Sequence, residues 1–324
     1  MLKLMKSEPI VIVAGEPNSI FFEIFLKTYK NNKFKSPIIL ICSKKLFLKQ
    51  AKKLKQKIYF NELNKNYFLL KNFKYQKLNL INVDYDQKKI FKKISPKSNN
   101  YIKMSFDIGL KLMEEGVSKK FINGPISKEN FLKNKFNGIT EYLAYRTRTQ
   151  KFAMIIYNKE LSVSPLTTHI PIKYVSKRIN KNEIINKVKL ISDFWKKKFN
   201  SKVRIGVTGL NPHCESIHKL NEDKKIIFPT VNLLKKRKFN ISGPYSADTI
   251  FTKKNRKKFD LIIGMYHDQV LTPIKTLFEY DAINITVGLP FIRVSPDHGP
   301  NERMLGKNLS NPLSLIRSIQ FLDN

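Results

Sequence analysis

Cysteine and long apolar runs are both scarce in this chain of 324 residues. The two cysteines, Cys42 and Cys214, cannot form the disulfide framework that small secreted domains use. No apolar run approaches the roughly 18 residues that a transmembrane helix needs, so we expect no membrane partner. The hydrophobic content of 42% is sufficient for a large core. We therefore expect a globular protein in a reducing, cytoplasmic setting.

Acidic residues are also few, with 25 Asp and Glu against 61 Lys and Arg, which gives a formal net charge of +36. The basic residues are spread through the chain, in runs such as 52–53, 196–198 and 235–238, on the expected solvated faces of amphipathic helices. This distribution favours a compositional bias over a patch built for nucleic acid, so no nucleic-acid partner is expected. The positive field should nevertheless favour anionic ligands.

The two common nucleotide motifs are missing. No G-x-G-x-x-G follows a predicted strand, and the P-loop pattern G-x-x-x-x-G-K-[ST] does not occur. A nucleotide that binds here must therefore be held by a different loop architecture.

What is present is an alternation of apolar strands with amphipathic helices. Strands are predicted at 9–15 and 38–42, each followed by a helix, and 152–157 with 161–166 reads as an antiparallel pair. Short strands are also expected at 57–60 and 78–83. This order predicts an α/β fold with a largely parallel sheet.

The stretch from 259 to 299 contains three predicted strands that each end in polar or turn residues. The first ends in 266–269 (YHDQ), the second in 288–290 (GLP), and the third leads through Arg293 to 297–299 (DHG). Ligands of open α/β sheets gather at the carboxyl ends of strands. We interpret these strand ends as one wall of an active site.

All five histidines lie between 169 and 298, and His169, His213 and His267 each follow a predicted strand. Three neutral imidazoles are a common ligand set for a divalent metal. Their separations of 44 and 54 residues (169 to 213, 213 to 267) match no compact metal motif, so scattered structural or acid/base histidines remain an alternative. His218 is interpreted as a surface residue, and His298 as lining the site without an obvious partner.

The segment 123–128, NGPISK, predicts a tight turn followed by a helix that Ser127 caps. The backbone N–H groups at such a helix start suit an anion. A purely structural turn is the alternative.

Seven motifs together resemble the 4-hydroxythreonine-4-phosphate dehydrogenase (PdxA) family: NGPISK, G-x-TEYLA, TTHIP, GLNPH, GPYSADT, MYHDQ and NITVGLPFIRVSPDHG. The resemblance runs from GEPNSI near residue 15 to the last helix. It implies two α/β/α domains with the active site in the cleft between them, similar to isocitrate and isopropylmalate dehydrogenases and distinct from a Rossmann fold. The implied domains are 1–130 with 290–324, which contains both termini, and 131–289, which carries the metal-binding histidines and the dimer contacts.

The resemblance also implies the reaction. An oxidoreductase of this family uses NAD or NADP and one divalent metal (zinc, magnesium or cobalt). It oxidises 4-phosphooxy-L-threonine to 2-amino-3-oxo-4-phosphooxybutanoate, which loses carbon dioxide to give 3-amino-2-oxopropyl phosphate in pyridoxal 5′-phosphate biosynthesis. It acts as a cytoplasmic homodimer with a shared active site, to which the partner subunit contributes one metal-binding histidine.

The implied site residues fall into three groups. The metal ligands match His169, His213 and His267, and the substrate contacts match Thr140, Lys275, Asn284 and Arg293. Lys275 or Asp268 assists proton transfer as the catalytic group, a choice that the sequence leaves open. No cofactor-binding residues are assigned.

One residue departs from the family pattern. The family usually has Gly-His-Thr-Glu where this chain has Gly138-Ile139-Thr140-Glu141, and the Ile139 side chain cannot donate a hydrogen bond. Either a nearby group replaces the histidine or the substrate differs. The alternative function is therefore a related metal-dependent dehydrogenase of another phosphorylated four-carbon hydroxy acid.

Overall fold

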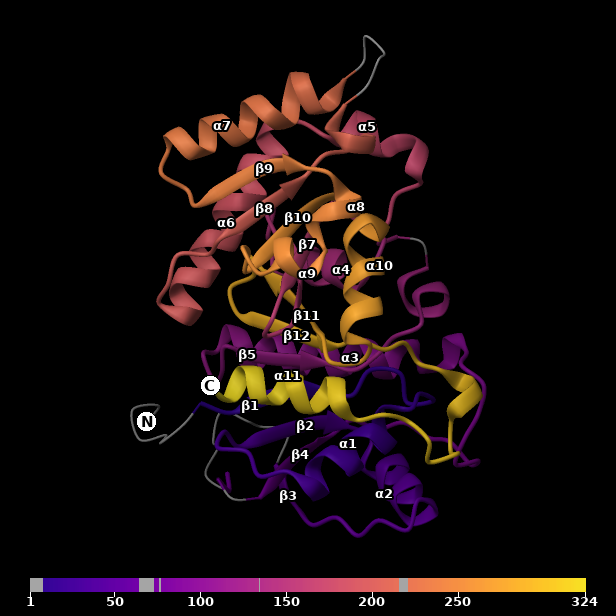
Figure 1. The fold of residues 1–324 in the computed structure, drawn as a ribbon. Coiled ribbons are helices and arrows are strands. Elements are labelled where there is room, and N and C mark those ends of the chain that lie inside the picture. Colours follow the sequence, from indigo (N-terminus) through magenta and orange to yellow (C-terminus); the bar gives the residue numbers. More distant parts are fainter. Residues whose placement is uncertain (1–7, 64–72, 76, 134, 216–220) are drawn as a thin grey trace. The chain divides into compact units, whose positions relative to one another are not determined.

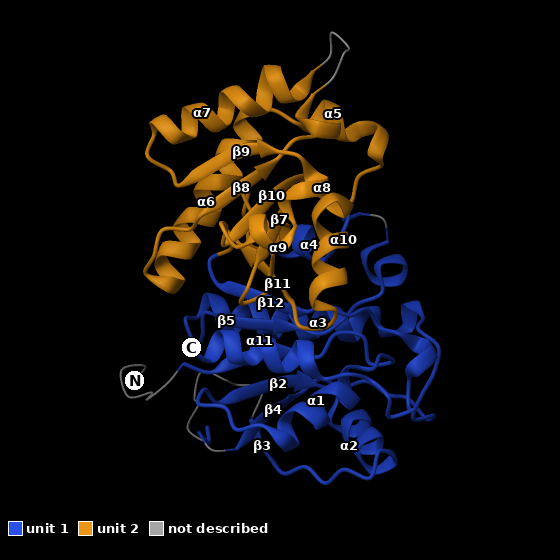
Figure 2. Ribbon diagram, viewed as in Figure 1, with its two compact units in different colours: residues 1–143, 290–324 blue, residues 144–289 orange. Residues whose placement is uncertain are grey.

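A computed structural model describes residues 8–63, 73–75, 77–133, 135–215 and 221–324. The chain divides into two compact units, which Figure 2 shows in different colours: unit 1 comprises 1–143 with 290–324, and unit 2 comprises 144–289. None of the helices in the described part of the chain is both long and apolar enough to span a membrane. The predicted α/β class is confirmed, because both units consist of a sheet covered by helices (Figure 1).

Unit 1 is built on six parallel strands in the order β3-β4-β2-β1-β5-β12. Their bounds are β1 Ile10–Val13, β2 Ile38–Cys42, β3 Phe60–Leu63, β4 Leu78–Asn82, β5 Lys120–Asn123 and β12 Ile292–Pro296. Every residue of β1 and β2 is buried, as expected for parallel strands that are covered on both faces. The expected strand at 57–60 begins later, at Phe60, because Phe60 is the residue that pairs with Leu78 at the start of β4.

The helices of unit 1 pack on this sheet. They are α1 Phe21–Asn31, α2 Lys44–Lys53, α3 Asn99–Glu114 and α11 Leu313–Asp323, with the start of α4 Ile139–Arg146. Helix α11 contacts β5 and β12, and α3 contacts β1 and β2. Gly109 permits the close approach of α3, because a Cβ there would lie 2.8 Å from Val13 Cγ2 and 2.9 Å from Phe121 Cε2. Ser127 caps the short π-helix Lys128–Leu132, as predicted, by accepting a hydrogen bond from the N–H of Asn130.

Unit 2 is built on the strand order β11-β6-β7-β10-β8-β9. Its strands are β6 Ala153–Tyr157, β7 Ser162–Thr167, β8 Ile205–Thr208, β9 Ile241–Tyr245, β10 Leu261–Tyr266 and β11 Ile283–Val287. Strand β6 runs antiparallel to both β7 and β11, which confirms the predicted antiparallel pair. Strands β7, β10, β8 and β9 are mutually parallel, so their carboxyl ends share one edge of the sheet.

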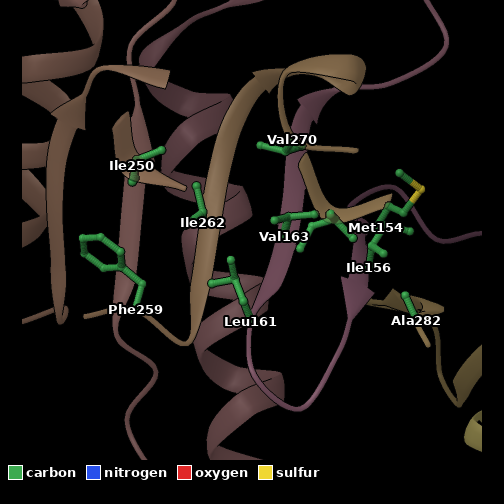
Figure 3. Close-up of a cluster of buried hydrophobic side chains, with 10 residues drawn as sticks. Met154, Ile156, Leu161, Val163, Ile250, Phe259, Ile262, Val270 and Ala282 are labelled. Atoms are coloured by element: carbon green, nitrogen blue, oxygen red, sulfur yellow. The ribbon is translucent and has the colours of Figure 1, made fainter. Parts of the chain in front are cut away.

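The helices of unit 2 include the amphipathic α6, which the sequence predicts from the spacing of its apolar residues. The set is α5 Val175–Arg178, α6 Lys181–Phe199, α7 Phe228–Lys236, α8 Ala247–Ile250, α9 Lys253–Arg256 and α10 His267–Phe278. Figure 3 shows the core in which residues of β6, β7 and β10 pack against α8 and α10, with Val163 and Ile262 in the sheet and Val270 on the helix. This core fixes α10, and therefore the residues at its start, against the sheet.

Candidate active site

The three predicted metal-binding histidines follow neighbouring parallel strands of unit 2. His169 lies two residues beyond the end of β7, His267 comes directly after β10, and His213 follows β8 in the short helix Pro212–Cys214. The carboxyl ends of these strands lie at the same edge of the sheet. The loops that carry the three imidazoles therefore leave the sheet on the same side, as the sequence predicts.

His169 and His267 lie close together, with their ring centroids 5.6 Å apart. The ends of their strands are joined by the Thr167 hydroxyl, which donates to the carbonyl of Met265 over 2.8 Å. Nδ1 of His267 lies 2.6 Å from Oδ1 of Asp268. A carboxylate at Nδ1 favours a proton on that nitrogen and leaves Nε2 to act as a metal ligand. The two imidazoles therefore fit as part of the ligand set of a transition metal.

His213 is placed differently, because it is exposed and adopts a left-handed backbone conformation with φ of 55°. Its Nδ1 lies 3.5 Å from Oγ of Ser246, which donates to Asp248 over 2.5 Å. In the part of the chain that the structure describes, no three residues among His, Cys, Asp and Glu form a group that could hold a metal ion. The structure thus brings together two of the three histidines, and the complete set stays a prediction. His218 lies outside the described residues.

Two residues to which sequence reasoning gave no role of their own, Asp223 and Gln269, hold the loops at this edge. Asp223 is buried, and its carboxylate accepts hydrogen bonds from the backbone N–H groups of Leu210 and Asn211, just before His213. Gln269 accepts through Oε1 from the Thr208 hydroxyl and donates through Nε2 to the carbonyl of Gly209. Gln269 therefore ties the end of β8 to α10, which begins with His267. The sequence signal for Gln269 was its place in the strand end 266–269, whereas Asp223 had no such signal.

Lys275, Asn284 and Asp268 also belong to unit 2. Lys275 lies on α10 about two turns after His267, and burial lowers the pKa of its ammonium group. Oδ1 of Asn284, in β11, is buried without a hydrogen-bond partner among the described residues. Asp268 is the most accessible, with 79% of its side chain exposed. A buried amide oxygen and a partly buried ammonium group suit a polar ligand better than a closed core.

Unit 1 contains a second polar cluster, around Arg293 in β12. The Arg293 side chain is fully buried, with 0% of its surface exposed. Its Nε donates to Oδ1 of Asn123 over 2.7 Å, and its Nη1 donates to the hydroxyl of Thr140 over 3.3 Å. Burial lowers the pKa of Arg293, and the negative charge of Glu141 acts in the opposite direction. Arginine nevertheless stays protonated at neutral pH, so the cluster contains a buried positive charge beside the negative charge of Glu141.

The structure thus brings together Thr140 and Arg293, two of the predicted substrate contacts, and it adds Asn123 and Glu141 to them. Sequence reasoning treated Asn123 only as part of a turn, because its partner is 170 residues away. His298 follows β12, its Nδ1 lies 3.1 Å from the carbonyl of Gly299, and burial lowers the pKa of its imidazole.

Fold and site together define an α/β enzyme with polar clusters at the ends of its parallel strands. The chain belongs to the family of the pyridoxal phosphate biosynthetic protein PdxA, whose family model matches residues 33–322.

Individual relatives support this membership along nearly the whole chain. The 4-hydroxythreonine-4-phosphate dehydrogenase of Sulfurihydrogenibium sp. (strain YO3AOP1) is 36% identical over 316 residues, which cover 96% of each protein. A protein of Oceanobacillus iheyensis, named "Putative D-threonate 4-phosphate dehydrogenase", is 29% identical over 97% of each protein. The crystal structure of 4-hydroxythreonine-4-phosphate dehydrogenase from Klebsiella pneumoniae matches with a TM-score of 0.83 at 25% identity, covering 97% of this chain and 98% of that one.

Proposed function

We propose that this chain oxidises 4-hydroxythreonine 4-phosphate at C3, with NAD or NADP as the hydride acceptor. The resulting β-keto acid then loses carbon dioxide to give 3-amino-2-oxopropyl phosphate. Membership in the PdxA family makes the chain an oxidoreductase of pyridoxal phosphate biosynthesis. The observation that carries the finer proposal is the pair of imidazoles, His169 and His267, 5.6 Å apart at neighbouring strand ends.

The proposed metal ligands are His169, His213 and His267. A divalent metal (zinc, magnesium or cobalt) held by neutral imidazoles keeps its full charge and stabilises the alkoxide that develops at the substrate hydroxyl. The described residues of one chain bring together only the pair of His169 and His267. We therefore propose a homodimer in which a second copy completes each ligand set.

The remaining residues bind the substrate and move a proton. Arg293 and Thr140 contact an anionic group of the substrate, and Asn284 contributes a polar contact through its amide. Lys275 is suited to proton transfer, because burial lowers its pKa and so favours the neutral amine that can accept a proton. Asp268 is the alternative base, although its contact with Nδ1 of His267 favours a role in orienting that imidazole.

The first experiment measures reduction of NAD and of NADP by the purified full chain with 4-hydroxythreonine 4-phosphate and added Zn²⁺, Mg²⁺ or Co²⁺. We expect metal-dependent turnover that is lost in His169→Ala and retained in His218→Ala, a histidine outside the proposed ligand set. Absence of turnover from folded, metal-loaded protein would contradict the proposed substrate.

A second candidate substrate is D-threonate 4-phosphate. It is favoured by Ile139, which replaces the usual family histidine, and by the Oceanobacillus iheyensis relative with that name. The two substrates differ in an amino or a hydroxyl group at C2. A comparison of kcat/KM for both, in the wild type and in Ile139→His, separates the two proposals. Preference of the wild type for 4-hydroxythreonine 4-phosphate would dismiss the second one.

The proposed dimer has support beside His169. Ile172 is 73% exposed and Tyr174 is 44% exposed, an unusual placement for apolar side chains next to a metal ligand. Sedimentation analysis of the wild type and of an Ile172→Asp variant tests this surface. We expect the wild type to be dimeric and the variant to shift toward the monomer, and a monomeric wild type would contradict the shared site.

We propose the cytoplasm, where NAD and the phosphorylated substrate are available, as the place of action.

A further inference from the structure

We propose that Asn123 is a positioning residue for the reaction: its side chain holds the Arg293 guanidinium in the orientation that binds the substrate's anionic group. The inference rests on the proposed role of Arg293 as a substrate contact. Asn123 would therefore contribute to substrate affinity. From its position at the end of a strand alone, only a role in a turn is expected.

The sheet of unit 1 brings the two side chains to the same face. Strands β5 and β12 are parallel neighbours, and Arg293 lies opposite Phe121 in their register. Side chains alternate along a strand, so Asn123, two residues beyond Phe121, points to the same face and is the diagonal neighbour of Arg293. The resulting bond from Nε of Arg293 to Oδ1 of Asn123 is 2.7 Å long, within the usual range for a bond from a charged donor.

Asn123 cannot turn its amide away from the arginine without losing a second bond. Its Nδ2 donates to the carbonyl of Gly124 over 2.8 Å, and Asn123 is only 2% exposed. Gly124 is itself fixed, because its N–H donates to the carbonyl of Val13 over 2.7 Å. Since a guanidinium group has only donors, the amide oxygen must face Arg293 and the amide nitrogen must face the carbonyl of Gly124. The orientation of Asn123 is therefore determined by its surroundings.

The neutral amide also adds no negative charge to that of Glu141 beside Arg293. Asn123 and Thr140 accept hydrogen bonds from Arg293 without carrying a charge of their own. A carboxylate at position 123 would accept the same bond but would offset the charge that attracts an anion. An apolar residue there would leave the charge in place but remove the acceptor that orients it. Both changes should weaken anion binding, for different reasons.

The test measures the affinity of the full chain for inorganic phosphate by isothermal titration calorimetry, and the KM and kcat for the phosphorylated substrate. We expect Asn123→Ala to raise both the phosphate Kd and the KM about tenfold, the lower end of the effect of losing a hydrogen bond to a charged group. The value of kcat should change much less, because the reacting atoms are untouched. Phosphate binding requires no turnover, so the phosphate Kd still tests the role of Asn123 even if the chain does not catalyse the proposed dehydrogenase reaction.

Two further variants separate positioning from a general loss of structure. Asn123→Asp keeps the shape and the acceptor for Arg293 but loses the donor to the carbonyl of Gly124, so it should stay folded with Tm within a few degrees of wild type yet bind phosphate at least tenfold more weakly. Asn79→Ala is the matched control: Asn79 is a buried amide of unit 1 that bonds to the backbone of Lys74, and its loss should lower Tm without changing the phosphate Kd.

A double-mutant cycle completes the test. In an Arg293→Lys background, Asn123→Ala should have little further effect, because Asn123 acts through the guanidinium. Wild-type phosphate affinity in Asn123→Ala would overturn the proposal. Equal weakening of phosphate binding by Asn79→Ala, or full additivity with Arg293→Lys, would do the same.

Discussion

The arginine cluster of unit 1 and the histidine pair of unit 2 are built in opposite ways. Arg293 is fully buried and is held by bonds from its own unit, whereas the side chain of His267 is 34% exposed and His169 is exposed. Burying a charge is costly unless neighbouring groups compensate, so the residues around Arg293 must be in place before a ligand arrives. Exposed imidazoles carry no such cost. The proposed anion site would thus be formed in advance, whereas the proposed metal ligands can take their final positions when an ion binds.

The largest effect is expected from removing the buried charge. Arg293→Met keeps most of the side-chain volume but removes the guanidinium, so kcat/KM should fall by about 100-fold or more, as for loss of a buried charge contact. Replacing a buried charge by an apolar side chain is often neutral for stability, so Tm should change little. Steady-state kinetics and thermal unfolding together check both parts. A large fall in Tm would show that Arg293 serves mainly to stabilise unit 1.

We next expect that the histidine pair of unit 2 and the arginine cluster of unit 1 bind their ligands independently of each other. His169→Ala should lower the affinity for Co²⁺ by at least about tenfold, because one imidazole ligand is lost. Phosphate binding should stay within about twofold of wild type, because Arg293 and its partners do not use the metal. Metal titration followed by the visible absorption of Co²⁺, with phosphate calorimetry on the same samples, measures both. Loss of phosphate binding in His169→Ala would contradict the independence of the two sites.

A smaller effect on metal affinity is expected from removing the hydrogen bonds that hold the loops of the proposed histidine ligands. Gln269→Ala removes the link between Thr208, Gly209 and α10, and residues that orient metal ligands typically affect affinity about tenfold or more. We expect the Co²⁺ affinity to fall by about tenfold with Tm lowered by a few degrees. Gln50→Ala is a useful control, because Gln50 is also buried but bonds to the carbonyl of Pro17 in unit 1. Equal metal affinities in the two variants would contradict a positioning role for Gln269.

The smallest effect concerns a buried acid of unit 1, Glu16. Burial raises its pKa above 4.5, against the opposing hydrogen bond from Ser98. A raised folded-state pKa gives stability that is present below the unfolded pKa and is lost as pH rises through the folded pKa. Glu16→Gln should therefore gain Tm relative to wild type as pH rises from about 4.5 to neutrality. Thermal unfolding across this range measures it, and a difference that is independent of pH would contradict the sign.

Sequence periodicity sufficed to predict the parts of the fold that depend on local pattern. The apolar strands, the antiparallel pair and the placement of His267 directly after a strand all follow from the alternation of buried and polar residues. Strand β3 was misplaced by a few residues, because its bounds depend on the position of its partner β4. The contacts of Arg293 and Gln269 were not predicted either. They join residues 170 and 61 positions apart, and no local pattern encodes such pairings.

The discontinuity of unit 1 has a consequence for how the protein is made. Strand β12, with Arg293, is synthesised after the whole of unit 2, which is one continuous stretch. Until then the edge of β5 has no partner there, and Asn123 faces no guanidinium. Unit 2 can begin to fold on the ribosome while unit 1 is still incomplete, since domains fold as their sequences emerge. The proposed anion site is therefore completed late in synthesis, and we expect a chain terminated at residue 289 to lack it.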